Sequence, residues 1–267
     1  MKIDKKQLKT VQQIDGTGIG TPHKGELNTI GEFVKELMPR IPESKVKGVV
    51  EQQMGGSMDD LGFDETFSMS FEYFPGVKVR VVYFKADTNE GDDMFAEADV
   101  KFFFSGEVVS MVSSEDLVGF TDLTMDYLQD LAIGKHSVVP DEPSDLLQRS
   151  ILQRLAPFAF LKRDDLPALA AFVGGKLTAT ELEWQITKTY FPGITIVMRY
   201  DGKRIAFEFT GGNVGRMNLH AKDELAIFML NHCLRFIGIT YAALKMPAIV
   251  EQAFSFSFSF SFLRKRT

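Results

Sequence analysis

Alternating apolar and polar residues predict β-strands at two places in the chain. Residues 67–73 alternate Phe, Met, Phe and Tyr with Ser and Glu, and residues 182–190 alternate in the same way except at Lys188. Each run leads into Tyr-Phe-Pro-Gly, in which proline fixes φ and glycine accepts a positive φ, as a type II turn requires. We therefore expect each run to turn back into a second strand, over residues 77–81 and 194–198.

A third strand is predicted in each region, over residues 100–104 and 205–209. In the second region Asp201-Gly202 precedes this strand and is a strong signal for a tight turn. The first region has a longer, acidic connection at the same point. Each set of strands has the pattern of an antiparallel sheet with one face on a hydrophobic core.

Apolar residues spaced three and four apart predict helices ahead of each set of strands. The first helix covers about residues 26–38 and stops at Pro39, and its counterpart starts at Ser144 and stops at Pro157. A shorter second helix ends on Gly-Gly in both regions, where a left-handed residue costs least. These shorter helices start at about Ser44 and about Asp165.

A long helix closes each region, beginning near Glu115 in the first and near Asp223 in the second. The helix from Asp223 to Lys245 is apolar nearly all round, and such a helix is usually buried on most sides. This pattern favours packing of the two regions as one pseudo-two-fold body over two separate beads.

The two regions are copies of one unit. Residues 73–82 (YFPGVKVRVV) align with residues 190–199 (YFPGITIVMR), and Gly-Gly pairs, Phe-x-Phe-x-Gly motifs and SEDL/KDEL segments recur in the same order. The fold class is therefore α+β, an internal duplication of an αα-βββ-α unit with antiparallel sheets. The expected divisions are an N-terminal segment (1–23), unit 1 (24–138), a linker (139–143), unit 2 (144–248) and a C-terminal tail (249–267).

Charge and cysteine content exclude several classes of function. With 30 Lys and Arg against 36 Asp and Glu, the net charge of -6 gives no general attraction to nucleic acid or anionic lipid. Cys233 is the only cysteine, so an internal disulfide, a Cys-ligated iron–sulfur cluster and a Cys-rich zinc site are excluded. Neither a signal peptide nor a membrane span is predicted, and we expect a cytoplasmic location.

Residues 74–131 resemble a family of prokaryotic domains of unknown function. The resemblance is carried by FPGVKVRVVYF, the acidic stretch GDDMFAEADVKFFF and SSEDLVGF at a helix start. Asp92, Asp93 and Phe95 match the acidic loop of the family, whereas Ala96 stands where the family tends to have proline. Members occur in anaerobes, some beside or fused to iron–sulfur modules. Because this chain has no cysteine cluster, the resemblance implies a cytosolic prokaryotic protein and no iron–sulfur centre.

The acidic connection in unit 1 is the first candidate site. It carries Asp87, Asn89, Asp92 and Asp93, and clustered oxygen ligands suit a hard cation such as Ca²⁺. The spacing departs from the EF-hand pattern, because Gly91 falls one position early and no glutamate stands at the twelfth position. We interpret the segment as a solvated hairpin tip, with metal binding and a partner contact as alternatives.

The glycine-rich stretch over residues 15–25 is the second candidate. Gly16, Gly18 and Gly20 follow a G-x-G-x-G spacing, whereas a dinucleotide fingerprint needs G-x-G-x-x-G directly after a buried strand. We interpret the stretch as an N-terminal linker, with phosphate binding as the alternative. No cofactor is predicted.

The third candidate is a set of polar residues on or near the last long helix. It comprises His220, Asn231, His232, Cys233 and Arg235. Adjacent helical residues such as His232 and Cys233 point about 100° apart, so they do not form a thiol–imidazole dyad. Asn231 and Arg235 share one face at i, i+4 and are interpreted as a structural polar stripe. A metal or thiol site is the alternative reading.

The tail alternates phenylalanine and serine strictly from residue 254 to residue 262. Low-complexity sequence is the interpretation that we favour. An edge strand, a membrane- or partner-binding tail and a self-associating segment are the alternatives.

The sequence predicts a binding function more readily than a catalytic one. No convergent set of catalytic residues is apparent, whereas two sheets carry aromatic rows that helices could cover. We expect a non-enzymatic protein that binds a protein partner or an apolar small ligand. The alternative is an enzyme that uses carboxylates or histidines between the two units.

Overall fold

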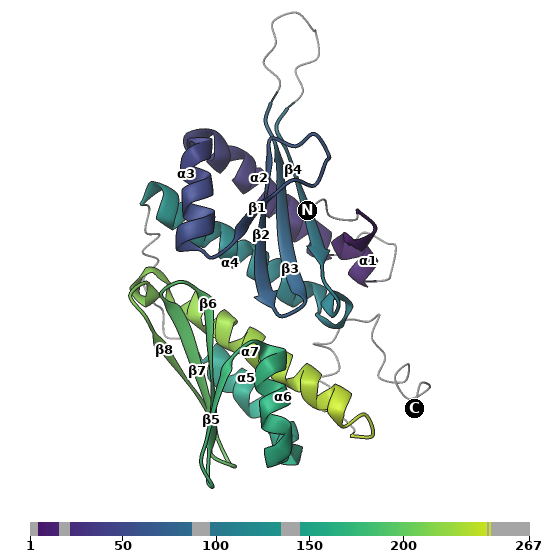
Figure 1. Cartoon of the computed structure of the whole chain (residues 1–267), viewed down its shortest axis with the longest axis vertical. Coiled ribbons are helices and arrows are strands. Elements are labelled where there is room, and N and C mark those ends of the chain that lie inside the picture. Colours follow the sequence, from purple (N-terminus) through teal and green to yellow (C-terminus); the bar gives the residue numbers. More distant parts are fainter. Residues whose placement is uncertain (1–4, 16–21, 87–96, 135–144, 245, 247–267) are drawn as a thin grey trace, which may run out of the picture. The chain divides into compact units, whose positions relative to one another are not determined.

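The computed structural model describes residues 5–15, 22–86, 97–134, 145–244 and 246, and it has the predicted α+β class (Figure 1). Two compact units divide the chain. Unit 1 comprises Met1–Val109 with Leu117–Lys135, and unit 2 comprises Ser110–Asp116 with His136–Thr267. The short segment Ser110–Asp116 therefore belongs with unit 2, although it lies within the first sequence repeat.

Unit 1 contains a four-stranded antiparallel sheet in the order β1-β2-β3-β4. The predicted strands are present as β2, β3 and β4, and the short edge strand β1 adds to them. Their bounds are β1 Ser57–Asp59, β2 Phe67–Phe74, β3 Val77–Phe84 and β4 Asp99–Ser105. The helices of this repeat are α1 Val11–Asp15, α2 Pro22–Leu37, α3 Glu43–Gly48 and α4 Ser114–Ile133.

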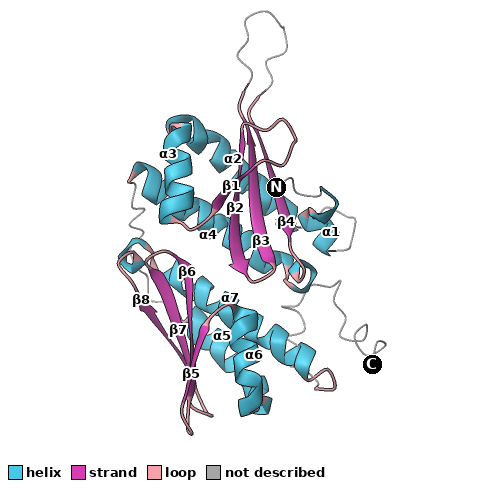
Figure 2. Cartoon of the chain, in the orientation of Figure 1, coloured by secondary structure: helices cyan, strands magenta, loops and turns pink. Residues whose placement is uncertain are grey.

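Unit 2 repeats the arrangement, with a sheet in the order β5-β6-β7-β8. The strands are β5 Lys176–Ala179, β6 Trp184–Phe191, β7 Ile194–Tyr200 and β8 Ile205–Thr210. The helices are α5 Leu146–Arg154, α6 Leu166–Val173 and α7 Leu219–Thr240. Short 3₁₀ and π segments, η1 to η7, join these elements, and Figure 2 shows the strands and helices of each unit by type.

Three predicted boundaries are wrong, each for a local reason. Leu182 was expected in a strand but is 86% exposed, because a turn in which Thr180 N–H donates to Glu183 C=O (2.8 Å) precedes β6. Helix α2 begins at Pro22, four residues early, since proline suits the first turn of a helix. Helix α7 also begins early, because the Asn218 side chain caps it by accepting from Ala221 N–H (2.8 Å).

Both hairpins close as the Pro-Gly signal predicts. Gly76 and Gly193 have φ of +73° and +79°, and each hairpin carries a register shift just before its turn, between Glu72 and Phe74 and between Thr189 and Phe191. The duplication therefore extends to the irregularities of the strands.

One face of each sheet forms the core with its helices. In unit 1 the Tyr73 ring on β2 stacks on Phe120 of α4, with centroids 4.3 Å apart. In unit 2 the Trp184 ring on β6 stacks with Phe158 at 6.3 Å. Helix α7 has no exposed residue between Leu225 and Gly238, as its all-round apolar pattern predicts.

The opposite face of the sheet is covered in unit 1. Leu8 of the N-terminal segment and Leu61 of the β1–β2 connection pack with Val82, and Phe63, Phe84 and Phe103 surround them. In unit 2 the corresponding face carries Gln185, Thr187 and Arg199, which are partly or fully exposed. The sheet of unit 2 is thus buried on one face, whereas the sheet of unit 1 is buried on both faces.

Candidate functional site

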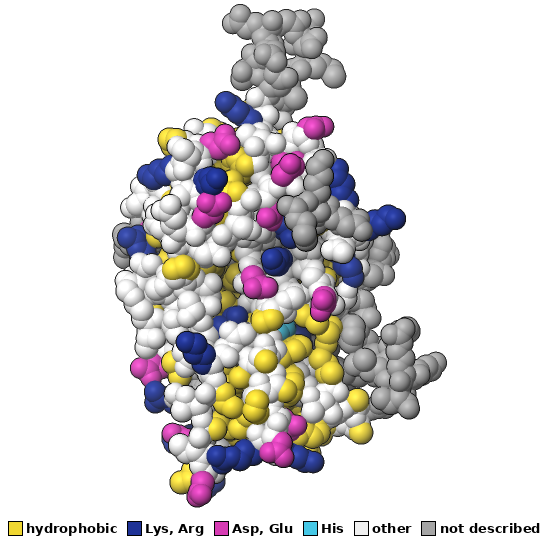
Figure 3. Space-filling view, viewed as in Figure 1, with side chains coloured by type: hydrophobic (Ala, Val, Ile, Leu, Met, Phe, Trp, Pro, Cys, Tyr) yellow, Lys and Arg dark blue, Asp and Glu magenta, His cyan; other side chains and the backbone are white. Residues whose placement is uncertain are grey.

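A pocket of about 610 Å³ lies in unit 1 beside the edge strand β1. Helix α3, strand β1, the β1–β2 connection and the start of β2 form its walls. Its lining residues are Glu43, Ser44, Lys47, Met58, Asp59, Asp60, Glu65, Thr66 and Phe67. Figure 3 shows charged side chains of both signs over this part of unit 1.

The β1–β2 connection forms one wall of the pocket, and Glu65 holds its conformation. Its two carboxylate oxygens accept from Leu61 N–H (2.6 Å) and Phe63 N–H (2.7 Å). Partial burial by itself raises the pKa of Glu65. The backbone N–H groups around the carboxylate lower the pKa by more than burial raises it, so the pKa lies below the ordinary value. Asp60 also binds the connection, by accepting from Gly62 N–H at 2.9 Å.

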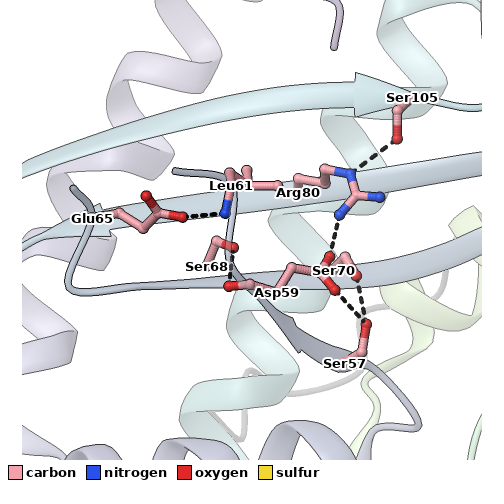
Figure 4. A network of polar contacts seen from close by, with 8 residues as sticks. All are labelled: Ser57, Asp59, Leu61, Glu65, Ser68, Ser70, Arg80 and Ser105. Carbon is pink, nitrogen blue, oxygen red and sulfur yellow. Dashed lines mark hydrogen bonds and ion pairs between the residues drawn. The ribbon is translucent and has the colours of Figure 1, made fainter. Parts of the chain in front are cut away.

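A buried arginine neutralises one of the lining carboxylates (Figure 4). Arg80 on β3 is 6% exposed, and its Nη1 forms an ion pair with Asp59 of β1. Its Nε donates to Ser105 Oγ at 3.0 Å. The guanidinium therefore spans from β1 to β4 across the sheet and compensates the charge of Asp59.

Serine hydroxyls complete this network around Asp59. Ser57 Oγ donates to Asp59 Oδ1 at 3.2 Å and lies 2.8 Å from Ser70 Oγ. Ser68 Oγ donates to the Asp59 carbonyl at 2.7 Å. The edge strand β1 is only three residues long, so these bonds fix its position against β2.

The pocket lining is acidic and partly apolar. With Asp59 paired to Arg80, the carboxylates of Glu43, Asp60 and Glu65 remain against the single ammonium group of Lys47. Met58 and Phe67 add apolar surface. The lining, as far as the structure describes it, includes neither histidine nor cysteine, so its chemistry suits recognition of a cation with an apolar stem better than proton transfer near neutral pH.

The predicted polar stripe on α7 is present and has a partner. Asn231 Nδ2 donates to Asp116 Oδ1 at 3.0 Å, and Arg235 forms an ion pair with the other oxygen of the same carboxylate. Arg154 Nε donates to Asn231 Oδ1 at 2.9 Å, and Arg235 also donates to Ser113 Oγ at 3.3 Å. Asn231 and Arg235 thus do share one face, and both contact the Asp116 carboxylate.

The remaining α7 residues do not come together. His232 is fully buried and stacks on Phe172 at 4.4 Å, and burial together with the charges of Arg235 and Lys188 puts its pKa well below the ordinary value. Burial raises the pKa of the Cys233 thiol far above its usual range. The His220 side chain is 67% exposed and lies 3.3 Å from Glu224 on the same helix.

Two predicted candidates lie outside the described residues. They are the acidic connection with Asp87, Asn89, Asp92 and Asp93, and the glycine positions 16, 18 and 20. The Phe-Ser tail also lies outside them. Over the described part of the chain, no group of three or more His, Cys, Asp or Glu side chains is arranged to hold a metal ion.

Sequence reasoning missed the Arg80–Asp59 pair, although a signal for it exists. Arg80 stands among valines on the central strand, where Val197 occupies the matching position of the second copy. The serines at 68 and 70 also occupy the polar positions of the neighbouring strand. A charge that only one of two copies places in a sheet centre points to a specific partner.

Comparisons with known proteins find no match: no family model, no curated protein and no solved structure is similar to this chain. The resemblance of residues 74–131 to a prokaryotic family therefore stays a prediction. None of the helices within the described ranges has the length and apolar character needed to cross a membrane.

Proposed function

We propose that this protein is a binding module for a partner protein, and that the unit 1 pocket receives a lysine or arginine side chain of that partner. The observation that carries the proposal is that one pocket is lined both by carboxylates and by apolar side chains. The carboxylates are those of Glu43, Asp60 and Glu65, and the apolar side chains are Met58 and Phe67. Lys and Arg carry a long apolar stem and a cationic head, so both parts of the pocket would be used.

The carboxylates are prepared for such a ligand. Glu65 is kept ionised by the backbone N–H groups around it, and Asp60 is oriented by its bond to Gly62 N–H. A group that is already fixed loses less conformational entropy on binding. Glu43, exposed in the first turn of α3, adds a third negative charge at the same opening.

An apolar small ligand suits this pocket less well. Such a ligand would cover the carboxylates without pairing them, and burying an unpaired charge is costly. The enzymatic alternative stays a prediction, since the described histidines, His23, His220 and His232, do not line the pocket.

Calorimetric titration with short peptides tests the proposal. The probes share one length and one apolar background and carry a central Arg, Ala or Glu. We expect binding of the Arg peptide alone, weakened by added salt because the Debye length shortens. Glu43→Gln and Asp60→Asn should each weaken it by up to about fivefold, as expected for exposed charge pairs.

Glu51→Gln is the matched control, because Glu51 is an exposed glutamate next to α3 that does not line the pocket. It makes the same change in net charge and should leave the affinity unaltered. Equal binding of the Arg and Glu peptides, or equal losses in all three variants, would contradict the proposal.

A further inference from the structure

Strand β8 lies at the edge of the unit 2 sheet, and no described segment pairs with its outer side. It ends the strand order β5-β6-β7-β8, and its side chains Ala206, Glu208 and Thr210 are exposed. Phe207 and Phe209 are partly exposed on the other face of the strand. An edge of this kind is a template for pairing with another strand.

The same edge in unit 1 is already paired. Lys9 of the N-terminal segment forms a bridge with Phe104 of β4, in which Lys9 N–H donates to Phe104 C=O and Phe104 N–H donates to Lys9 C=O, both at 2.8 Å. Helix α2 also packs on β4, where Gly31 approaches Phe102 closely enough that a Cβ would lie 3.6 Å from its ring.

The register shows which β8 groups correspond to the paired ones. Phe104 stands opposite Val79 on β3, and Phe209 stands opposite Ile196 on β7, the residue that matches Val79 in the repeat. Because both sheets have the same strand order, the Phe209 N–H points away from β7, toward the outer edge of the sheet, as the Phe104 N–H points away from β3. Every second residue of a strand has this orientation, so the N–H groups of Ile205 and Phe207 also point to the outer edge.

No described residue takes the place of Lys9 on β8. Within the described ranges, the backbone groups of Ile205, Phe207 and Phe209 make no hydrogen bond outside the sheet. Among the described residues, the β4 edge of unit 1 is thus covered and the β8 edge of unit 2 is open.

We propose that a second copy of this chain pairs with β8, strand to antiparallel strand, about a two-fold axis through Phe207. Phe207 then faces Phe207 of the second copy, and Ile205 faces Phe209. The three outward amides of each strand meet outward amides, so every one of them is paired. An isologous contact of this kind closes at a dimer.

Charge and backbone pairing together favour this register over its two neighbours. Centred on Phe207, Glu208 faces Ala206 of the second copy and Thr210 faces Arg204, so no like charges meet. Shifting the centre to Glu208 would set two glutamates directly opposite, which is destabilising. Shifting it to Ala206 would set Arg204 opposite Glu208, but it would place Phe209 against Lys203 in the β7–β8 turn. The Lys203 N–H already donates to Asp201 Oδ1 at 2.9 Å, so the outward backbone groups of Phe209 would not all be paired.

Sedimentation velocity and amide hydrogen exchange of the full chain test the dimer. We expect the sedimentation coefficient to shift from monomer to dimer as concentration rises, and exchange at Phe207 and Phe209 to slow over the same range. Exchange at Phe104 should be independent of concentration, because Lys9 pairs with it inside one chain. A monomer at every concentration, or exchange at Phe207 that does not change, overturns the proposal.

Two substitutions at one exposed position give opposite expected results. Ala206→Glu sets a glutamate against Glu208 of the second copy and should abolish the concentration dependence. Ala206→Lys sets a lysine against Glu208 of the second copy, and the dimer should then form at a lower protein concentration. Melting curves check that each variant folds.

Thr178→Glu and Thr178→Lys are the controls, since Thr178 is exposed on the opposite edge strand β5 and gives the same changes in net charge. Equal effects at both positions would mean that net charge, not β8, governs association, and would overturn the proposal. So would pairing of β8 with an unrelated extended peptide while the chain itself stays monomeric.

Discussion

Two glycines close the sheets of this protein at matching positions. Gly106 and Gly211 have φ of +123° and +121°, a region that residues with a Cβ rarely adopt. A Cβ on Gly211 would lie 2.2 Å from the Gly193 carbonyl oxygen, and one on Gly106 would lie 2.0 Å from that of Gly76. The end of the third long strand of each repeat therefore rests directly on the backbone of the Pro-Gly turn.

Gly211→Ala should lower the free energy of unfolding by about 2 kcal/mol or more, because it combines backbone strain with a clash against main-chain atoms. Urea unfolding followed by circular dichroism measures the loss. Gly212→Ala is the control, since its Cβ would meet nothing within 4 Å. A comparable loss in both variants would refute the close-approach explanation.

Among the elements, α7 shows how much a periodic pattern leaves open. Its apolar residues predict a buried helix, and Asn231 and Arg235 predict a polar stripe on it. The partner of that stripe, Asp116, is 115 residues away from Asn231 along the chain, so no local pattern could identify it. Asp116 occupies the first turn of α4, where an acidic residue is expected in any case.

Arg235→Met should cost about 3–5 kcal/mol, because it leaves the Asp116 carboxylate buried without its cation. Asp116→Asn added to Arg235→Met should restore part of that loss, since the double variant removes both charges of this pair. Chemical unfolding of the singles and the double gives the coupling free energy.

Arg149→Met provides the comparison, because the Arg149–Asp145 pair is 67% and 70% exposed. Its loss should stay below about 1 kcal/mol. If the Arg235 and Asp116 changes simply add, the two side chains do not act as a pair.

Over the whole molecule, the two repeats share a fold and differ in what covers it. In unit 1 the outer sheet face is closed by Leu8 and Leu61 and contains Arg80, whereas the outer face of unit 2 is polar and partly exposed. The two repeats thus share one architecture, and among the described residues the pocket beside β1 lies in unit 1 and the uncovered β8 edge lies in unit 2.

Cys233 should report the opening of unit 2. It is fully buried and its pKa is raised by burial, so the thiolate needed for alkylation is scarce in the folded protein. We expect negligible labelling by a maleimide at pH 8 without denaturant and complete labelling in urea. Rapid labelling of the folded chain, with unchanged circular dichroism, would show that the thiol is reachable.

The sequence alone determined the α+β class, the duplicated unit, the three long strands of each repeat and both Pro-Gly hairpins. The strands and hairpins depend on period and turn chemistry, which act over a few neighbouring residues, and the duplicated unit is visible because these local patterns recur in the same order. The short strands β1 and β5 escaped prediction because three or four residues are too few to show a period.

Only the tertiary structure decided the features on which the proposals depend. The ion pairs of Arg80 with Asp59 and of Arg235 with Asp116, the pocket beside β1 and the pairing of Lys9 with Phe104 all join residues that are far apart in the chain. Such contacts are set by how the elements pack, since a buried charge or a sheet edge takes whichever partner the fold brings within reach.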